Sequence, residues 1–258
     1  MMSEQQKDEE IRPPRRGEPI FMLPVVVTVL GGSMLIIQAL SSFVLNAAGR
    51  VSLLVWLGFI PARLIAPDQF PGGLWPLAWT AATYGLLHAG WEHVIGNVVW
   101  LVIFGTPVAR RYGTGPTLII FFVSSIVGAI AFAISEFHTI AYLVGASGGI
   151  AGLTGAATRF IFQPVVVGRD PETGEPILLG RRMATIPELL RSPAARAFSI
   201  IWVVLNCLVP LVPLVIGQDV AIAWQAHLGG FFTGLLLVPF FEHGGAGKVQ
   251  HPNAATDA

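Results

Sequence analysis

The sequence predicts an all-α polytopic membrane protein with six transmembrane helices and both termini in the cytoplasm. Three observations support this fold class. Apolar residues make up 53% of the 258 residues and charged residues only 12%, whereas a soluble domain carries about 25% charged residues. Six segments are mostly apolar over lengths near the ~20 residues that cross a bilayer. Lys and Arg are also concentrated in the parts that this topology puts inside.

The six expected spans divide the chain into a polar N-terminal tail (1–20), a membrane domain (21–241) and a C-terminal tail (242–258). The spans are expected at 21–45, 93–109, 116–135, 147–162, 197–216 and 221–241. The fourth is short and partly polar, so its assignment also depends on its neighbours. No internal repeat is evident, and the inverted symmetry of many transporters is therefore not visible.

Two connections between the expected spans are long. The connection 46–92 contains the apolar stretch 51–60, too short to span, followed by a region rich in Pro and Gly, with scattered Trp residues. Tryptophan favours the membrane interface, so we expect a structured outer loop lying on or partly in the outer leaflet. The connection 163–196 is polar and rich in Arg, with a turn at 170–174, and is expected to be a cytoplasmic loop with little chemistry.

The distribution of positive charge sets the expected orientation. With the N-terminus inside, 13 of the 15 Lys and Arg residues are cytoplasmic, and only Arg50 and Arg63 are outside. The positive-inside rule therefore supports six spans with both ends in the cytoplasm. The formal net charge is zero, which gives no case for nucleic-acid binding.

Two polar residues in separate apolar segments are the first candidates for chemistry. Ser147 lies at the head of the fourth segment, between Gly145 and Gly148, and His227 lies in the sixth, ahead of Gly230 and Gly234. A hydroxyl and an imidazole are costly in a bilayer unless they meet each other or water, and small residues let helices approach closely. The pair is therefore interpreted as a serine nucleophile and its general base. No Asp or Glu lies within the spans, so we expect a dyad without a carboxylate that orients the imidazole.

A second cluster lies at the start of the second span. His93 and Asn97 are four residues apart and share a helix face, and His88 precedes them in the loop. The two residues could donate hydrogen bonds to a developing oxyanion, or they could form an interfacial histidine cluster with Asn97 joining helices. His88 and His93 are five apart, about 140° around a helix, so they would not chelate one ion. No metal and no cofactor are expected.

These motifs together resemble the rhomboid family of intramembrane serine proteases, over roughly residues 75 to 241 and including the six-span layout. The family's Gly-x-Ser-Gly motif falls on Ser147, and its Ala-His-x-x-Gly-x-x-x-Gly motif on His227. Its His-x4-His-x3-Asn motif reads His88, His93 and Asn97. The resemblance implies that His93, Asn97 and the Ser147 backbone N–H stabilise the oxyanion, and that His88 is structural. The chain departs from common family patterns at three positions, which are Thr80, Ala109 and Ala151.

The resemblance implies an intramembrane serine endopeptidase that cleaves transmembrane segments of membrane proteins with a Ser147–His227 dyad. Its substrates would be helices that unwind easily near the outer face, and its location the lipid bilayer of a bacterial inner (plasma) membrane. Two other functions stay open from the residues alone: a transporter that uses His93, Asn97 and His227 as a polar pathway, and a non-catalytic binder of membrane helices. The natural substrate, cleavage site and oligomeric state do not follow from the sequence.

Overall fold

The computed structural model describes residues 23–136, 138, 141–169, 174, 176–208 and 223–242. The expected N-terminal tail, all but Glu242 of the expected C-terminal tail, and residues 209–222, which include parts of the fifth and sixth expected spans, lie outside the described residues. The expectation that both termini are cytoplasmic concerns residues that also lie outside the described part of the chain.

Each of the six expected spans contains a helix in its described part. The first is α1 (Val25–Phe43), and the second is a continuous helical stretch made of α4 (Trp91–Trp100), a π-helical turn (Leu101–Gly105) and α5 (Thr106–Tyr112). The others are α6 (Thr114–Glu136), α7 (Ser147–Ile161), α9 (Pro193–Leu208), and α11 (Trp224–Leu237) with the 3-10 turn Val238–Phe241. Among the described residues, three helical stretches are long and apolar enough to cross a membrane: Val25–Phe43, Trp91–Tyr112 and Thr114–Glu136. The count of six spans stays a prediction.

The π-helical turn in the second span has a local cause. Pro107 lies two residues after its end at Gly105, and a proline has no N–H to donate one turn back, while its ring crowds that carbonyl. Widening the preceding turn relieves the crowding, as π-bulges commonly do inside α-helices. The stretch therefore continues through the proline from Trp91 to Tyr112.

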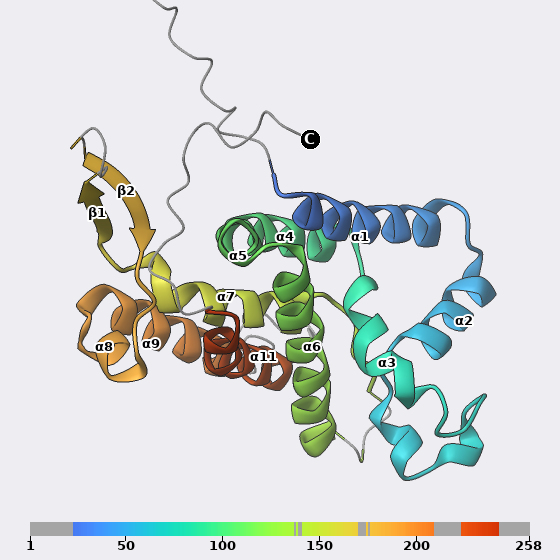
Figure 1. Ribbon diagram of the computed structural model, residues 1–258. Helices are drawn as coiled ribbons and strands as arrows, with labels where there is room; N and C mark the ends of the chain where they lie inside the picture. The colour runs from blue at the N-terminus through green and yellow to red at the C-terminus, as the bar shows by residue number, and fades with distance from the viewer. Residues whose placement is uncertain are drawn as a thin grey trace, which may run out of the picture.

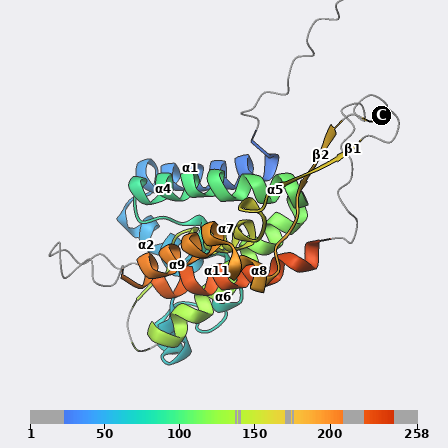
Figure 2. The ribbon, with the colours of Figure 1, turned by 90° about the vertical axis from the view of Figure 1, so that its left-hand side faces the viewer.

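Helix α7 lies at the centre of the protein. Figure 1 shows it between α6, the α4–α5 stretch and α11, and Figure 2 shows α1 and α4–α5 side by side along one flank. Every residue from Gly148 to Phe160 is buried. Small residues dominate this helix, so its neighbours can pack against its backbone rather than against side chains.

The closest of these contacts joins α7 to α11. A Cβ added to Gly230 would overlap the carbonyl oxygen of Gly148, and one added to Gly234 would overlap the carbonyl oxygen of Gly152. Arg159 strengthens the far end of the pair, because its guanidinium donates to the Leu235 carbonyl oxygen at 2.9 Å. The two backbones thus meet along a strip that only glycine permits.

The connection 46–92 consists of short helices: α2 (Ala47–Leu57), 3-10 turns at Pro61–Leu64, Pro67–Gln69 and Tyr84–Leu86, and α3 (Leu77–Thr83). Arg63 is fully buried among them. Its guanidinium donates to the carbonyl oxygens of Val55, Pro71 and Gly73 at 2.8–2.9 Å. One cation thereby satisfies three backbone acceptors and joins the two halves of the connection.

The connection 163–196 corrects the expectation of an all-α chain. It contains an antiparallel hairpin of β1 (Val165–Arg169) and β2 (Pro176–Arg181), and then α8 (Ile186–Arg191). The run of β-branched residues in β1 favours a strand, a signal that the overall polarity of this region obscures. The expected turn at 170–174 falls between the strands, but residues 170–173 lie outside the described residues.

The contact between α7 and α11 predicts a strong effect of a single methyl group. We expect Gly234→Ala to lower the free energy of unfolding by about 1–3 kcal/mol, because the helices must separate. Gly32→Ala on α1 is the matched control: nothing lies within 4 Å of its Cβ position, so the change should be neutral or stabilise by about 0.5–1 kcal/mol. Unfolding in mixed micelles with increasing SDS measures both, and equal effects would contradict the proposed packing.

Candidate active site

Ser147 is the first residue of α7, and the chain reaches it through a sharp turn at Gly145. Gly145 has φ +118°, a conformation that only glycine adopts without strain. A Cβ on Gly145 would lie 2.7 Å from the His93 ring. The glycine before the serine therefore serves two purposes, since it makes the turn and leaves room for the imidazole.

Tyr84 holds this turn against the rest of the protein. The Gly145 N–H donates to the Tyr84 carbonyl oxygen at 3.1 Å, and the buried Tyr84 hydroxyl donates to the Ser125 carbonyl oxygen on α6 at 2.9 Å. The same hydroxyl lies 2.8 Å from the Cβ position of Gly148. Sequence analysis missed Tyr84, because nothing in its local sequence indicates which distant backbone groups it meets.

His88 touches the chain next to Ser147. The Ala146 N–H donates to His88 Nε2 at 3.4 Å, and the His88 and His93 rings meet edge to face with centroids 5.0 Å apart. Burial, together with the charge of His93, lowers the pKa of His88 from its usual 6.5 to about 4. The ring is therefore neutral at physiological pH, as a hydrogen-bond acceptor at Nε2 must be.

His93 and Asn97 face the same turn from α4, as their four-residue spacing predicts. The Asn97 amide nitrogen lies 3.7 Å from the Cβ position of Gly145. Asn97 is buried, and its Nδ2 has no hydrogen-bond partner in the part of the chain that the structure describes. A buried donor without a partner is costly, so this amide can donate to a group that enters the site.

His227 reaches the site from α11. The residue before it, Ala226, has its carbonyl oxygen 3.5 Å from the Cβ position of Gly148, so the chain at His227 passes beside the start of α7. His227 is also close enough to His93 for the two rings to interact electrostatically. Its Nδ1 lies 2.7 Å from Oδ1 of Asn206 on α9. After Tyr84, Asn206 is the second residue of the site that sequence analysis missed.

The structure therefore brings the predicted site residues to one place, the N-terminal end of α7. Ser147 comes from α7, His93 and Asn97 from α4, His227 from α11, and His88 from the loop before α4. Within the described part of the chain, no group of three or more His, Cys, Asp or Glu residues could hold a metal ion. The chemistry available is that of a hydroxyl, imidazoles, an amide and backbone N–H groups.

The three departures from the common family pattern are all buried and close-packed. Thr80 on α3 is fully buried with its hydroxyl unpartnered, and Ala109 packs in the main core. Ala151 lies in a buried cluster with Phe231 and Leu235 of α11. A small residue at 151 therefore supports the close approach of α7 and α11.

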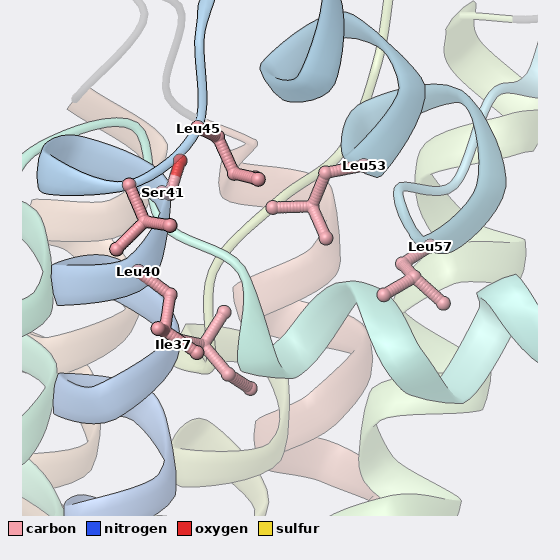
Figure 3. Close-up of a pocket in the computed structure, with 7 residues that line it drawn as sticks. Ile37, Leu40, Ser41, Leu45, Leu53 and Leu57 are labelled. Atoms are coloured by element: carbon pink, nitrogen blue, oxygen red, sulfur yellow. The ribbon is translucent and has the colours of Figure 1, made fainter.

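Two cavities open beside the His88 loop, between α1 and α2. Figure 3 shows the first, of about 230 Å³, lined by Ile37 and Leu40 of α1, Leu53 and Leu57 of α2, and neighbouring residues. The second, of about 430 Å³, is more polar and includes His88 among its lining residues. The first is an apolar gap between two helices, and the second gives His88 a partly polar surrounding.

Comparison with known proteins adds independent findings. The Rhomboid domain family model matches residues 77–243. Rhomboid-related protein 2 of Mus musculus is 32% identical over 78 residues, covering 30% of this chain and 25% of that protein. Rhomboid protease GluP of Bacillus subtilis is 32% identical over 160 residues, covering 60% of this chain and 27% of that protein.

A third relative matches over a longer region. Rhomboid protease GlpG of Pectobacterium atrosepticum is 25% identical over 205 residues, covering 80% of this chain and 60% of that protein. The chain thus spans between a quarter and three fifths of the length of these relatives. Together with the three long apolar helices, the matches identify an integral membrane protein.

The environment of His88 predicts a pH dependence of stability. The folded protein binds fewer protons than the unfolded chain between the lowered pKa of about 4 and the usual 6.5. The contribution of neutral His88 to the free energy of unfolding is therefore fully present above pH 6.5 and is lost as the pH falls toward 4. We expect the melting temperature in detergent to fall more steeply with acidification for the wild type than for His88→Gln, a neutral acceptor. Parallel curves for the two proteins would contradict this assignment.

Proposed function

The chain belongs to the rhomboid family, and on this basis we propose that it is an intramembrane serine endopeptidase. The observation that carries the proposal is the close backbone contact of α7 and α11 at Gly148, Gly152, Gly230 and Gly234, with Ser147 and His227 at its N-terminal side. Close approach of the two helices is what a hydrogen bond between a serine hydroxyl and an imidazole requires. The proteases among its relatives, at 25–32% identity, are consistent with this reaction.

In the proposed reaction, Nε2 of His227 accepts the proton of the Ser147 hydroxyl as Oγ attacks a peptide carbonyl. The C–O bond forms and the carbonyl oxygen becomes an oxyanion. His227 then gives the proton to the departing amine, which leaves an acyl-enzyme. Water attacks the ester carbon, His227 again accepts a proton, and the carboxylic acid is released with Ser147 restored.

The oxyanion needs donors that point at it before the reaction. The unpartnered amide of Asn97 supports this role, and so does its position beside the Gly145 turn. The Ser147 N–H belongs to the first turn of α7, where helix N–H groups have no intrahelical partner. His93 would be the third donor, through its ring nitrogen next to Gly145. Donors placed in this way stabilise the transition state more than the ground state.

The proposed substrates are transmembrane helices that unwind easily, because the backbone hydrogen bonds of a stable helix hide its carbonyl groups. With both termini in the cytoplasm, as the positive charges indicate, the start of α7 faces outside. Water would then reach Ser147 from the outer face. We propose a multi-pass location in a bacterial inner (plasma) membrane, with six spans.

The dyad is tested by single and double substitution. We expect Ser147→Ala and His227→Ala each to abolish cleavage of a transmembrane substrate reconstituted in vesicles, and the double variant to be no worse than either single one, because the pair acts as a unit. Ser124→Ala is the matched control: this serine of α6 is buried, its hydroxyl has no partner among the described residues, and its removal should leave turnover intact. Normal cleavage by Ser147→Ala would end the proposal.

Asn97 allows a separate test of the oxyanion site. We expect Asn97→Ala to lower kcat by ~10²–10³ with a smaller change in KM. Because Nδ2 has no partner among the described residues, loss of its N–H groups breaks no hydrogen bond there, and we expect the melting temperature to change much less than kcat. Kinetics and thermal unfolding on one purified sample decide the point. A destabilised variant with the wild-type kcat would show that Asn97 joins helices and does not take part in catalysis.

A further inference from the structure

We propose that Asn206 of α9 is a positioning residue that holds the His227 imidazole with its proton on Nδ1, leaving Nε2 free to accept the Ser147 proton. The inference rests on the proposed function, since it concerns how the general base is oriented. Its starting point is the 2.7 Å contact between Asn206 Oδ1 and His227 Nδ1. The sequence offers no carboxylate in the spans for this task.

The orientation of the Asn206 amide determines which atom faces His227. Its Nδ2 donates to the Trp202 carbonyl oxygen one turn back in α9, at 2.8 Å. If the amide were reversed, its oxygen would face that carbonyl oxygen, and two acceptors would repel each other. Oδ1 therefore faces the imidazole. A carbonyl oxygen only accepts hydrogen bonds, so Nδ1 of His227 must carry the proton.

A second contact fixes α9 beside α11 at this level. Trp202 stacks on Phe231 with ring centroids 4.4 Å apart and planes 18° apart. Trp202 lies four residues before Asn206 and Phe231 four residues after His227, so the two contacts are one turn apart on antiparallel helices. The stacked rings hold the separation at which the amide and the imidazole meet. Asn206 thus lies in a braced contact and not on a loose helix surface.

The amide can do for His227 what an aspartate does in a serine–histidine–aspartate triad. In such triads the third residue holds the imidazole in the correct tautomer and stabilises the imidazolium that forms. The dipole of a neutral amide stabilises the imidazolium less than a full negative charge does. It is also far less costly to bury in an apolar segment. We therefore expect a contribution of about 10–100-fold to kcat.

Two substitutions separate orientation from packing. Asn206→Leu and Asn206→Asp both lose the bond from Nδ2 to Trp202, but only aspartate keeps an acceptor for Nδ1. We expect Asn206→Leu to lower kcat about 10–100-fold with little change in KM. Asn206→Asp should recover most of that loss. Ser199→Ala, which loses a similar bond within α9, to Ala195 at 2.8 Å, is the control and should keep full activity.

The pH dependence of kcat gives a readout that packing would not move. A carboxylate at 206 favours the imidazolium more than an amide does, so the acidic limb of the pH–rate profile should move to higher pH in Asn206→Asp. His93, whose charge acts on His227, is unchanged in all variants. If Asn206→Asp is as inactive as Asn206→Leu, and its acidic limb stays in place, the positioning role is wrong.

A measurement without activity separates this inference from the proposed function. Nitrogen NMR of protein labelled with ¹⁵N-histidine distinguishes the two neutral tautomers, and the His227 signals are those lost in His227→Gln. We expect the Nδ1–H tautomer in the wild type and a shift toward Nε2–H in Asn206→Leu. This result would stand even if Ser147→Ala still cleaved substrate. A predominantly Nε2–H tautomer in the wild type would overturn the inference while leaving a protease function possible.

Discussion

The contact between the backbones of α7 and α11 is the constraint on which the rest of the site depends. Gly230 and Gly234 lie against the carbonyl oxygens of Gly148 and Gly152, where any side chain would overlap. Without large side chains between them, helices in lipid associate through close van der Waals contact. The same contact carries Ser147 and His227 toward each other from segments eighty residues apart in the sequence. The glycine contact between α7 and α11 therefore accounts both for the packing of these helices and for the position of the proposed dyad.

The remaining groups of the site depend on how the turn before α7 is held. Its backbone N–H groups are taken up by the Tyr84 carbonyl oxygen and by His88. Tyr84 follows α3 in the connection 46–92, whose preceding part is held together by the buried guanidinium of Arg63. The connection 46–92 thereby supports the position of the serine without supplying a reacting group.

The sequence predicted those parts of the site that depend on local pattern and missed those that depend on tertiary contacts. Helix periodicity predicts that His93 and Asn97, four residues apart, share a face, and both face the Gly145 turn in the structure. Steric demand explains the glycines around Ser147, because neighbouring groups lie where their Cβ atoms would be. Asn206 escaped notice because an asparagine in an apolar segment has many ordinary roles, and its partner is 21 residues away on another helix. The hairpin at 163–196 was missed because the polarity of the region outweighed its short β-branched run.

The central claim is that His227 activates Ser147 across the glycine contact, and covalent labelling measures it most directly. The purified protein would be treated with a fluorophosphonate, which modifies only activated serine hydroxyls, and the modified peptide would be identified by mass spectrometry. The account predicts modification at Ser147, none at the neighbouring buried Ser124 and Ser125 of α6, and loss of labelling in His227→Gln. Labelling at another serine, or labelling of Ser147 at an unchanged rate without His227, would contradict it.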